Sequence, residues 1–148
     1  MKKNTIKCIP LYLVIVFTAL GLFASLASAG DKINWYSYEK GMKKANDEVK
    51  KIYINFHADW CYYCKVMKKT TFKDPAVISY LNENFVPIRI DTEKEKKLAR
   101  EYKVQGLPAN WFLEADGAKI GMKPGLLKPK ELLQNLKFVY DEKYKSKK

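Results

Sequence analysis

The chain has 148 residues, of which 47% are hydrophobic and 14% are aromatic. This composition provides enough apolar surface for one folded domain and excludes a disordered chain. The formal net charge is +12, but the lysines are spread along the chain and accompany no helix-turn-helix, RNP-type or zinc-finger pattern. Nucleic-acid binding is therefore disfavoured. A solvated basic surface is the simplest interpretation of the charge, with an anionic partner or a membrane surface as the alternative.

Residues 1–29 have the layout of a secretory signal peptide. A positive n-region precedes an uncharged, mostly apolar run over 9–26, and Ala27-Ser28-Ala29 fits an A-x-A cleavage site. The alternative is an uncleaved membrane anchor, because the uncharged run 8–30 is long enough to span a bilayer. We expect cleavage, which leaves residues 30–148 as a mature domain in the periplasm.

Cleavage changes the cysteine count. Cys8 leaves with the signal peptide, so the mature domain keeps Cys61 and Cys64, and the loss of three lysines lowers its net charge from +12 to +9. An exported domain is in an oxidising compartment, where a disulfide can form and persist.

The mature sequence alternates between helical and strand patterns. The helical spacing of Tyr38, Met42, Ala45 and Val49 predicts a helix over 36–50. A strand follows over 51–58, with Ile52, Ile54 and Phe56 on one face and Tyr53, Asn55 and His57 on the other.

The later predicted elements follow in chain order. They are a helix from Cys61 to Lys69, a helix over 76–84 behind the N-cap Asp74 and Pro75, a strand over 85–90, a helix over 93–102, strands over 110–114 and 118–122 joined by the turn 115–117, and a helix over 129–144. Early strand–helix alternation gives parallel strands, and the late hairpin adds an antiparallel edge. We therefore expect an α/β fold, a three-layer α/β/α sandwich with a mixed central sheet.

The segment DWCYYCK contains the pair Cys61 and Cys64. Covalent haem attachment needs a histidine directly after the second cysteine, where Lys65 stands. Structural zinc needs four ligands, but the mature chain has two cysteines and one histidine, so we expect no metal and no cofactor. A purely structural crosslink is disfavoured, because so short a loop removes little entropy from the unfolded chain. A thiol–disulfide couple needs only the pair between a strand and a helix, which the flanking pattern supplies.

Placement at the start of a helix gives the two cysteines different expected roles. Unpaired amide N–H groups and the helix dipole stabilise a thiolate at Cys61, lower its pKa and make it the nucleophile. Cys64 lies one turn further in, and we expect it to be the less exposed, resolving thiol. Trp60, Tyr62 and Tyr63 supply an apolar rim against which a partner chain can press.

The segments YINFHADWCYYCKVMKK, VPIRID and VQGLPANWFLEADG resemble the thioredoxin superfamily. The resemblance covers about residues 35–140. It is closest to exported thioredoxin-like domains such as the C-terminal domain of the bacterial thiol:disulfide interchange reductase. That domain shares the A-D-W-C-x-x-C-K motif, which includes Lys65, and the G-L-P motif. It implies that Pro108 is a cis-proline opposite the cysteines. A cis bond there presents the backbone of Leu107 for strand-like pairing with the cysteine segment of a partner.

Two positions depart from the family pattern. Thioredoxins usually carry a buried aspartate six residues before the first cysteine, where this chain has Asn55, and Pro87 stands where a lysine commonly pairs with that acid. Deprotonation of Cys64 is then left without its usual base. His57, the single histidine, lies on the same predicted strand face as Asn55. Our hypothesis is that His57, or a water held by Asn55, serves Cys64; a packed, half-exposed histidine is the simpler interpretation.

The leading functional hypothesis is an exported thiol–disulfide oxidoreductase that reduces partner disulfides. Its expected partners are disulfide-bearing or cysteine-bearing exported proteins and a membrane thiol electron donor, and its expected state is a monomer. The dipeptide Tyr62-Tyr63 contains no histidine that could stabilise the Cys61 thiolate, which favours a reducing or intermediate couple. The alternatives are a disulfide oxidase or isomerase, and a binding or chaperone module on the same scaffold.

Overall fold

The computed structural model describes residues 31–147. The predicted signal peptide and its cleavage site lie outside the described residues. Within residues 31–147, no helix is both long enough and apolar enough to cross a membrane.

Four strands form one mixed sheet in the order β2-β1-β3-β4. β1 (Lys51–His57) pairs in parallel with β2 (Phe85–Asp91) and antiparallel with β3 (Ala109–Leu113), and β3 pairs antiparallel with β4 (Lys119–Pro124). Parallel strands need a long crossover connection, and helices supply it between β1 and β2. Antiparallel strands can be joined by a short turn, and β3 and β4 form such a hairpin. The mixed central sheet expected from the sequence is confirmed.

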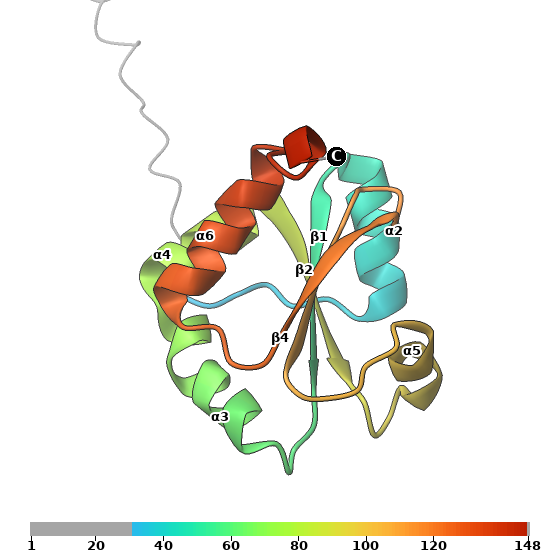
Figure 1. The fold of residues 1–148 in the computed structure, drawn as a ribbon, viewed down its shortest axis with the longest axis vertical. Helices are drawn as coiled ribbons and strands as arrows, with labels where there is room; N and C mark the ends of the chain where they lie inside the picture. Colours follow the sequence, from blue (N-terminus) through green and yellow to red (C-terminus); the bar gives the residue numbers. More distant parts are fainter. Residues whose placement is uncertain (1–30, 148) are drawn as a thin grey trace, which may run out of the picture.

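Helices cover both faces of this sheet and complete three layers (Figure 1). One face carries α2 (Tyr38–Glu48) and α5 (Lys96–Glu101), and the other carries α3 (Tyr62–Lys69), α4 (Pro75–Asn84) and α6 (Pro129–Tyr140). Two short 3-10 turns, η1 (Thr71–Lys73) and η2 (Lys145–Lys147), complete the described elements.

The central strand β1 is buried on both faces and therefore separates two hydrophobic clusters. Ile52, Ile54 and Phe56 belong to the cluster under α2 and α5. Tyr53 belongs to the cluster on the opposite face, together with Met67 of α3. Fully burying one side chain of this size contributes about 1.5–3 kcal/mol. Packing on both faces thus fixes the end of β1, from which the chain enters the CxxC segment.

α2 begins two residues later than predicted, because Tyr36 is bonded to β2 instead. The Tyr36 amide donates to the Pro87 carbonyl (2.9 Å), and the Arg89 amide donates to the Tyr36 carbonyl (3.2 Å). These bonds attach the segment before α2 to the outer edge of β2. An edge strand also tolerates Pro87, which has no N–H to donate.

The predicted inward position of Val49 is wrong. The other residues of its stripe lie in or against the core, but the helix ends at Glu48, and Val49 is 82% exposed. Val49 adopts the left-handed conformation (φ 52°, ψ 41°), and the Lys50 amide donates to the Ala45 carbonyl (3.0 Å) to close the helix. The apolar spacing continues past this cap, so the pattern alone does not locate the end of α2.

Two further helix ends differ from the predicted ranges. α6 ends at Tyr140 rather than at 144, because the backbone leaves the helical conformation and Glu142 takes a positive φ (55°). α5 begins at Lys96 rather than at 93, because a turn closed by the Asp91 carbonyl occupies residues 91–95. Both differences concern local capping and leave the order of the elements unchanged.

Candidate active site

The CxxC pair lies where β1 turns into α3. The Cys61 amide donates to the Ala58 carbonyl (3.1 Å), which closes the turn after the strand. Cys61 is the N-cap of α3, and its Sγ accepts a hydrogen bond from the Cys64 amide (3.1 Å). The first cysteine therefore sits at the helix N-terminus, where amide groups and the helix dipole favour negative charge.

Cys61 and Cys64 form a disulfide with a Cα–Cα distance of 5.3 Å. Cys61 is 4% exposed and Cys64 is 3% exposed. The expected difference in exposure between the two is thus absent in the disulfide form. A partner must reach into the surface to contact either sulfur.

The Leu107–Pro108 peptide bond is cis, as the resemblance implies. β3 begins at the next residue, Ala109, which pairs with Phe56 near the end of β1. The cis bond therefore lies at the same end of the sheet as the CxxC turn. The Gly125 amide donates to the Pro108 carbonyl (2.7 Å) and ties this loop to the end of β4.

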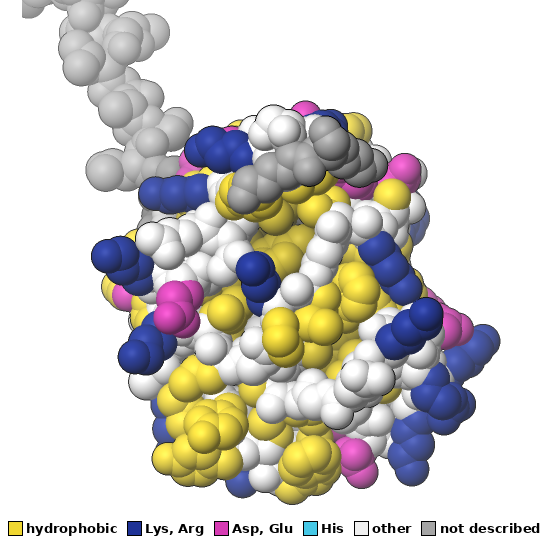
Figure 2. Space-filling view, in the orientation of Figure 1, with side chains coloured by type: hydrophobic (Ala, Val, Ile, Leu, Met, Phe, Trp, Pro, Cys, Tyr) yellow, Lys and Arg dark blue, Asp and Glu magenta, His cyan; other side chains and the backbone are white. Residues whose placement is uncertain are grey.

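An aromatic rim, defined here as Trp60, Tyr62 and Tyr63, surrounds the cysteines. These side chains are 68%, 71% and 55% exposed, and the two tyrosine rings meet edge to face with centroids 5.4 Å apart. Figure 2 shows hydrophobic side chains gathered over the start of α3 and the preceding turn, at the lower end of the molecule. A shallow groove beside Trp60 is lined by Thr92, Ala99 and residues 104–107.

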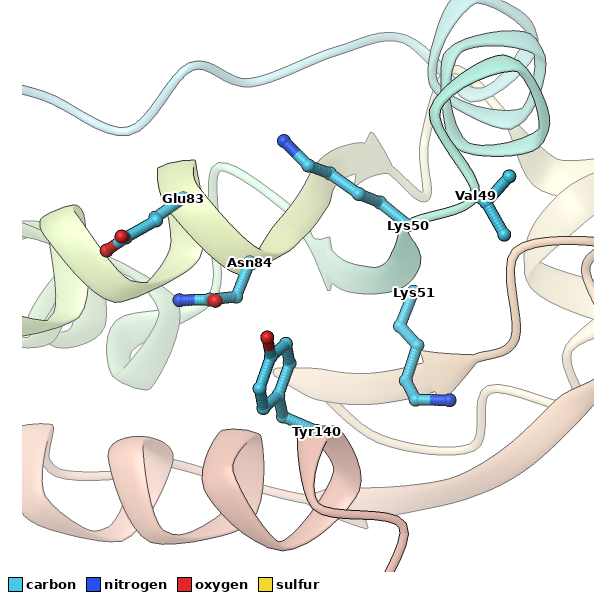
Figure 3. Close-up of a pocket in the computed structure, with 6 residues that line it drawn as sticks. All are labelled: Val49, Lys50, Lys51, Glu83, Asn84 and Tyr140. Atoms are coloured by element: carbon cyan, nitrogen blue, oxygen red, sulfur yellow. The ribbon is translucent and has the colours of Figure 1, made fainter.

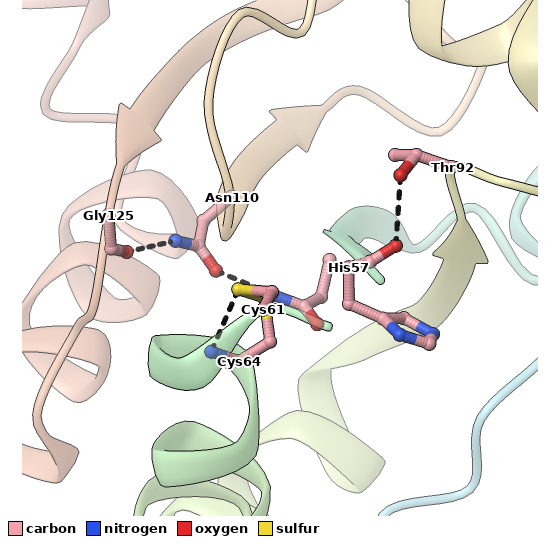
Figure 4. Close-up of a disulfide and its surroundings, with 7 residues drawn as sticks. His57, Cys61, Cys64, Thr92, Asn110 and Gly125 are labelled. Atoms are coloured by element: carbon pink, nitrogen blue, oxygen red, sulfur yellow. Dashed lines mark hydrogen bonds between the residues drawn. A yellow bond between two sulfur atoms is a disulfide. The ribbon is translucent and has the colours of Figure 1, made fainter. Parts of the chain in front are cut away.

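A buried polar network lies among the surroundings of the disulfide (Figure 4). Asn110 Oδ1 accepts from the Tyr53 hydroxyl (2.7 Å) and from Asn55 Nδ2 (3.1 Å). Asn110 Nδ2 donates to the carbonyls of Lys123 (3.1 Å) and Gly125 (3.0 Å). Asn55 thus occupies the usual aspartate position as part of a neutral network. The sequence analysis did not identify Asn110. Its position could have indicated it, because it is a polar residue inside a predicted strand, two residues after the Gly-Leu-Pro motif.

Arg89 is the second residue that the sequence reading missed. It pairs with Asn55 in the β1–β2 register, and its guanidinium lies over the rings of Trp35 (5.8 Å) and Phe72 (5.9 Å). Its Nε is buried without a hydrogen-bond partner among the described residues, and burial lowers its pKa. Arg89 therefore places a cation next to Asn55. It lies two residues after Pro87, which stands where the family commonly has a lysine.

His57 ends β1 and is half-buried. Its carbonyl accepts from the amide and the hydroxyl of Thr92 (2.9 and 3.3 Å), and in Figure 4 its ring is turned away from the two sulfur atoms. Burial lowers the pKa of His57, and the charges of Arg89 and Lys68 lower it further against the opposing effect of nearby carboxylates. The imidazole is therefore neutral at pH 7.

A second pocket lies at the opposite end of β1, where the strand begins (Figure 3). Its lining residues are Val49, Lys50, Lys51, Glu83, Asn84 and Tyr140. A strand rises about 3.3 Å per residue, so the length of β1 separates this pocket from the CxxC turn by roughly 20 Å. The pocket has no cysteine, and we assign the redox site to the other end.

A CxxC disulfide at the N-terminus of a helix, with a cis-proline directly before the neighbouring strand β3, defines a thioredoxin-fold protein with a dithiol–disulfide site. Residues 38–140 match the family model described as the thioredoxin-like domain. The chain therefore belongs to the thioredoxin-like thiol–disulfide oxidoreductase family.

Several similar proteins carry the name thiol:disulfide interchange protein DsbD. The one from Photorhabdus laumondii is 32% identical over 90 residues, which cover 59% of this chain and 15% of that protein. The one from Colwellia psychrerythraea is 32% identical over 109 residues, which cover 69% of this chain and 18% of that protein. The chain thus spans less than a fifth of either relative's length.

Solved structures share the fold. A thioredoxin from Thermus thermophilus has a TM-score of 0.67 and 27% identity, covering 73% of this chain and 87% of that one. A putative disulphide-isomerase from Bacteroides thetaiotaomicron has a TM-score of 0.63 and 29% identity, covering 74% and 92%. The DsbD C-terminal domain of Neisseria meningitidis, at 24% identity and a TM-score of 0.57, covers 67% and 90% and supports the fold alone. The predicted three-layer sandwich is confirmed.

Proposed function

We propose that this protein is an exported thiol–disulfide oxidoreductase that reduces disulfides in partner proteins. The observation that carries the proposal is the Cys61–Cys64 disulfide at the N-cap of α3, with the Cys64 amide directed at Cys61 Sγ. In the reduced protein the same amide is placed to stabilise a thiolate on Cys61.

The reaction moves two electrons in two exchanges. The Cys61 thiolate attacks one sulfur of the partner disulfide, forms a mixed disulfide and releases the other partner sulfur as a thiolate, which takes a proton. Cys64 then loses its proton and attacks Cys61 Sγ, which releases the second partner sulfur as a thiol. The protein ends in the Cys61–Cys64 disulfide form seen here.

Regeneration of the dithiol needs an electron donor. We propose a membrane dithiol protein in this role, because several relatives are named thiol:disulfide interchange protein and because the N-terminal sequence has the layout of an export signal. On this proposal the mature domain works as a periplasmic monomer, and cysteine-bearing or disulfide-bearing exported proteins are its substrates.

Substitution of each cysteine tests the proposed roles. Cys61→Ser should lower insulin disulfide reduction to the uncatalysed rate, because no nucleophile remains. Cys64→Ser should instead accumulate a mixed disulfide with the substrate, detected by non-reducing electrophoresis and mass spectrometry. Each variant controls for the other, and mixed disulfides in Cys61→Ser but not in Cys64→Ser would show that the roles are reversed.

The reduction potential tests the proposed direction. Thioredoxin lies at about −270 mV and the strong oxidant DsbA at about −120 mV. Equilibration with glutathione buffers should place this couple below about −200 mV. A value close to that of DsbA would favour the second candidate, an oxidase or isomerase, which the similarity to a putative disulphide-isomerase also keeps in view. Full cellular function in a cysteine-free variant would instead favour a binding module.

The proton of Cys64 has two candidate acceptors, and we propose water near Asn55 rather than His57. Asn55 is held in the buried network by Asn110, whereas the His57 imidazole forms no hydrogen bond with either cysteine among the described residues. His57→Phe should therefore leave the pH profile of disulfide reduction unchanged. Loss of an ionisation between about pH 5 and 7 in this variant would identify His57 as the acceptor.

A further inference from the structure

The outer face of α3 carries lysines and no carboxylate. Lys65, Lys68 and Lys69 lie on α3, Lys73 follows on η1, and all four are exposed. No aspartate or glutamate occurs between Asp59 and Asp74. This stretch of 14 residues after Asp59 includes the whole CxxC motif.

Some lysines on other elements have an acidic partner. Lys43 pairs with Asp47 (2.7 Å), Lys97 with Glu101 (3.9 Å) and Lys143 with Asp141 (2.8 Å). Within residues 31–147, none of the four lysines at α3 and η1 forms an ion pair. Unpaired, exposed lysines such as Lys32 and Lys40 also occur elsewhere in the described part of the domain. The α3 group differs from them because its four lysines lie within residues 65–73, next to the disulfide, in a stretch without any acidic residue.

Helical geometry places this charge beside the aromatic rim. Steps of three and four residues return to the same side of a helix, so Tyr62, Lys65 and Lys69 share one side of α3. At 1.5 Å per residue, Lys65 and Lys69 lie about 6 and 12 Å along the axis from Cys61. The Debye length at physiological ionic strength is about 8 Å, so an extended chain along α3 would feel several of these charges at once.

The partner chain must come close to this face. Because the two cysteines are only 4% and 3% exposed, a partner sulfur reaches them only when the flanking chain lies against the rim. Tyr62 is the first residue of α3 and belongs to that rim, so a segment that continues past Tyr62 passes over the lysines.

We propose that the basic face of α3, defined by Lys65, Lys68, Lys69 and Lys73, docks an acidic segment that flanks the target disulfide of the partner protein. This proposal rests on the proposed function and adds the substrate class. Positive charge next to the rim raises the encounter rate with an acidic partner and disfavours a basic one.

The experiment uses three quenched fluorescent peptides, each with one intramolecular disulfide, flanked by three glutamates, three glutamines or three lysines. The protein is reduced chemically and freed of reductant, so that each molecule passes two electrons to one peptide disulfide in a single turnover. At about 20 mM salt we expect the glutamate peptide to react on the order of tenfold faster than the glutamine peptide, with the lysine peptide slowest. At about 0.5 M salt the three rates should agree within about twofold.

Two triple variants locate the effect. Lys65→Gln, Lys68→Gln and Lys69→Gln together should bring the glutamate-to-glutamine rate ratio to within about twofold of unity. The matched control changes Lys32, Lys40 and Lys137 to Gln. These exposed lysines lie on other parts of the domain and form no ion pair among the described residues, so the same loss of net charge should leave the ratio unchanged. Thermal unfolding checks that both variants are folded.

Three results would overturn the proposal. The first is equal rates for the glutamate and glutamine peptides with the unaltered protein, and the second is an equal loss of preference in both triple variants. The third is an α3 variant that keeps its preference for the glutamate peptide but no longer binds phosphatidylglycerol vesicles. That result would show that the basic face of α3 binds a membrane surface instead of an acidic segment.

Failure of the proposed function is a separate result. If no peptide is reduced at all, docking is still measured by fluorescence anisotropy with the glutamate peptide carrying serines in place of its cysteines. Binding that the α3 variant loses and the matched control keeps would support the acidic-segment site without reduction, whereas no binding would overturn both proposals.

Discussion

At the scale of single residues, the site differs from the family pattern by replacing charge with hydrogen bonds. Asn55, Asn110 and Tyr53 form a neutral buried network, and Arg89 supplies a cation from the neighbouring strand. A lone aspartate at position 55 would be a buried charge facing the amide oxygen of Asn110. The amide oxygen of Asn110 accepts hydrogen bonds and cannot donate one to a carboxylate, so the asparagine keeps a bond that an aspartate would lose.

His57 gives a residue-scale prediction for stability against pH. Its folded pKa lies below the unfolded value of about 6.5, because burial and the Arg89 charge oppose protonation. Above that pH both states are neutral, and below it the unfolded chain takes up the proton first, so the free energy of unfolding falls. Urea unfolding from pH 7.5 to 5 should show a larger loss for the unaltered protein than for His57→Gln. Parallel curves would contradict the assigned direction.

Val49 gives a second residue-scale prediction. A β-branched side chain in the left-handed conformation (φ 52°) is strained. Asparagine tolerates this conformation, so Val49→Asn should raise the free energy of unfolding by about 1 kcal/mol in urea titration. Val49→Thr keeps the branch and is the matched control, with no gain expected. An equal gain in both variants would point to the removal of exposed apolar surface instead.

At the scale of elements, the helices of the active-site face are positioned by their caps. Cys61 caps α3 with its sulfur, and Asp74 caps α4 with Oδ1, which accepts from the amides of Ala76 and Val77 (both 3.0 Å). The sequence indicated the α4 cap through the Asp74-Pro75 pair, since proline at the first helical position follows a capping residue. η1 contacts both α3 and α4 and so links the capped start of α4 to the end of α3.

The cap of α4 gives an element-scale prediction. Asp74→Ala removes both side-chain hydrogen bonds and should lower the free energy of unfolding by about 1 kcal/mol. Ser37 is the matched control, because it is the N-cap of α2 but forms no side-chain cap bond. Ser37→Ala should therefore change stability by no more than a few tenths of a kcal/mol. Equal losses from the two substitutions in chemical denaturation would contradict the role of the Asp74 carboxylate.

At the scale of the whole molecule, one polar cluster joins the start of β1, the end of β3 and the segment after α6. Lys51 Nζ donates to Glu114 (2.6 Å), Glu142 (3.0 Å) and the Tyr144 hydroxyl (3.2 Å), and Tyr144 also donates to Glu114. Burial by itself raises the pKa of Glu114, but the bonds from Lys51 and Tyr144 outweigh it and hold that pKa below its usual value. The cluster closes the end of the molecule opposite the disulfide.

This cluster gives the whole-molecule prediction. Lys51→Met should lower the free energy of unfolding at pH 7 by about 1 kcal/mol, because it leaves a partly buried carboxylate without its cation. The folded pKa of Glu114 is depressed, so its stabilisation exists above the unfolded pKa of about 4.3 and is lost as the pH falls below it. The difference between the two proteins should therefore shrink in acid.

The matched control for Lys51→Met is Lys43→Met. Lys43 pairs with Asp47 at 2.7 Å, but the two side chains are 78% and 55% exposed. An exposed pair of this kind contributes little, so we expect a change of at most about 0.5 kcal/mol. Urea unfolding at pH 7 and pH 3.5 measures both variants, and a pH-independent loss for Lys51→Met would contradict the electrostatic interpretation.

The sequence by itself determined the order of the elements, the mixed sheet, the family and the cysteine pair, because these depend on local periodicity and on short motifs. It did not reveal that α2 stops before Val49, that Arg89 lies next to Asn55 or that Asn110 joins Asn55 to Tyr53. Each of these depends on residues distant in the chain: Asn110 and Asn55 meet only because β3 pairs antiparallel with β1. Tertiary packing also decided that both cysteines are buried in the disulfide form, because the exposed fraction of a side chain depends on what folds around it and not on its place in the motif.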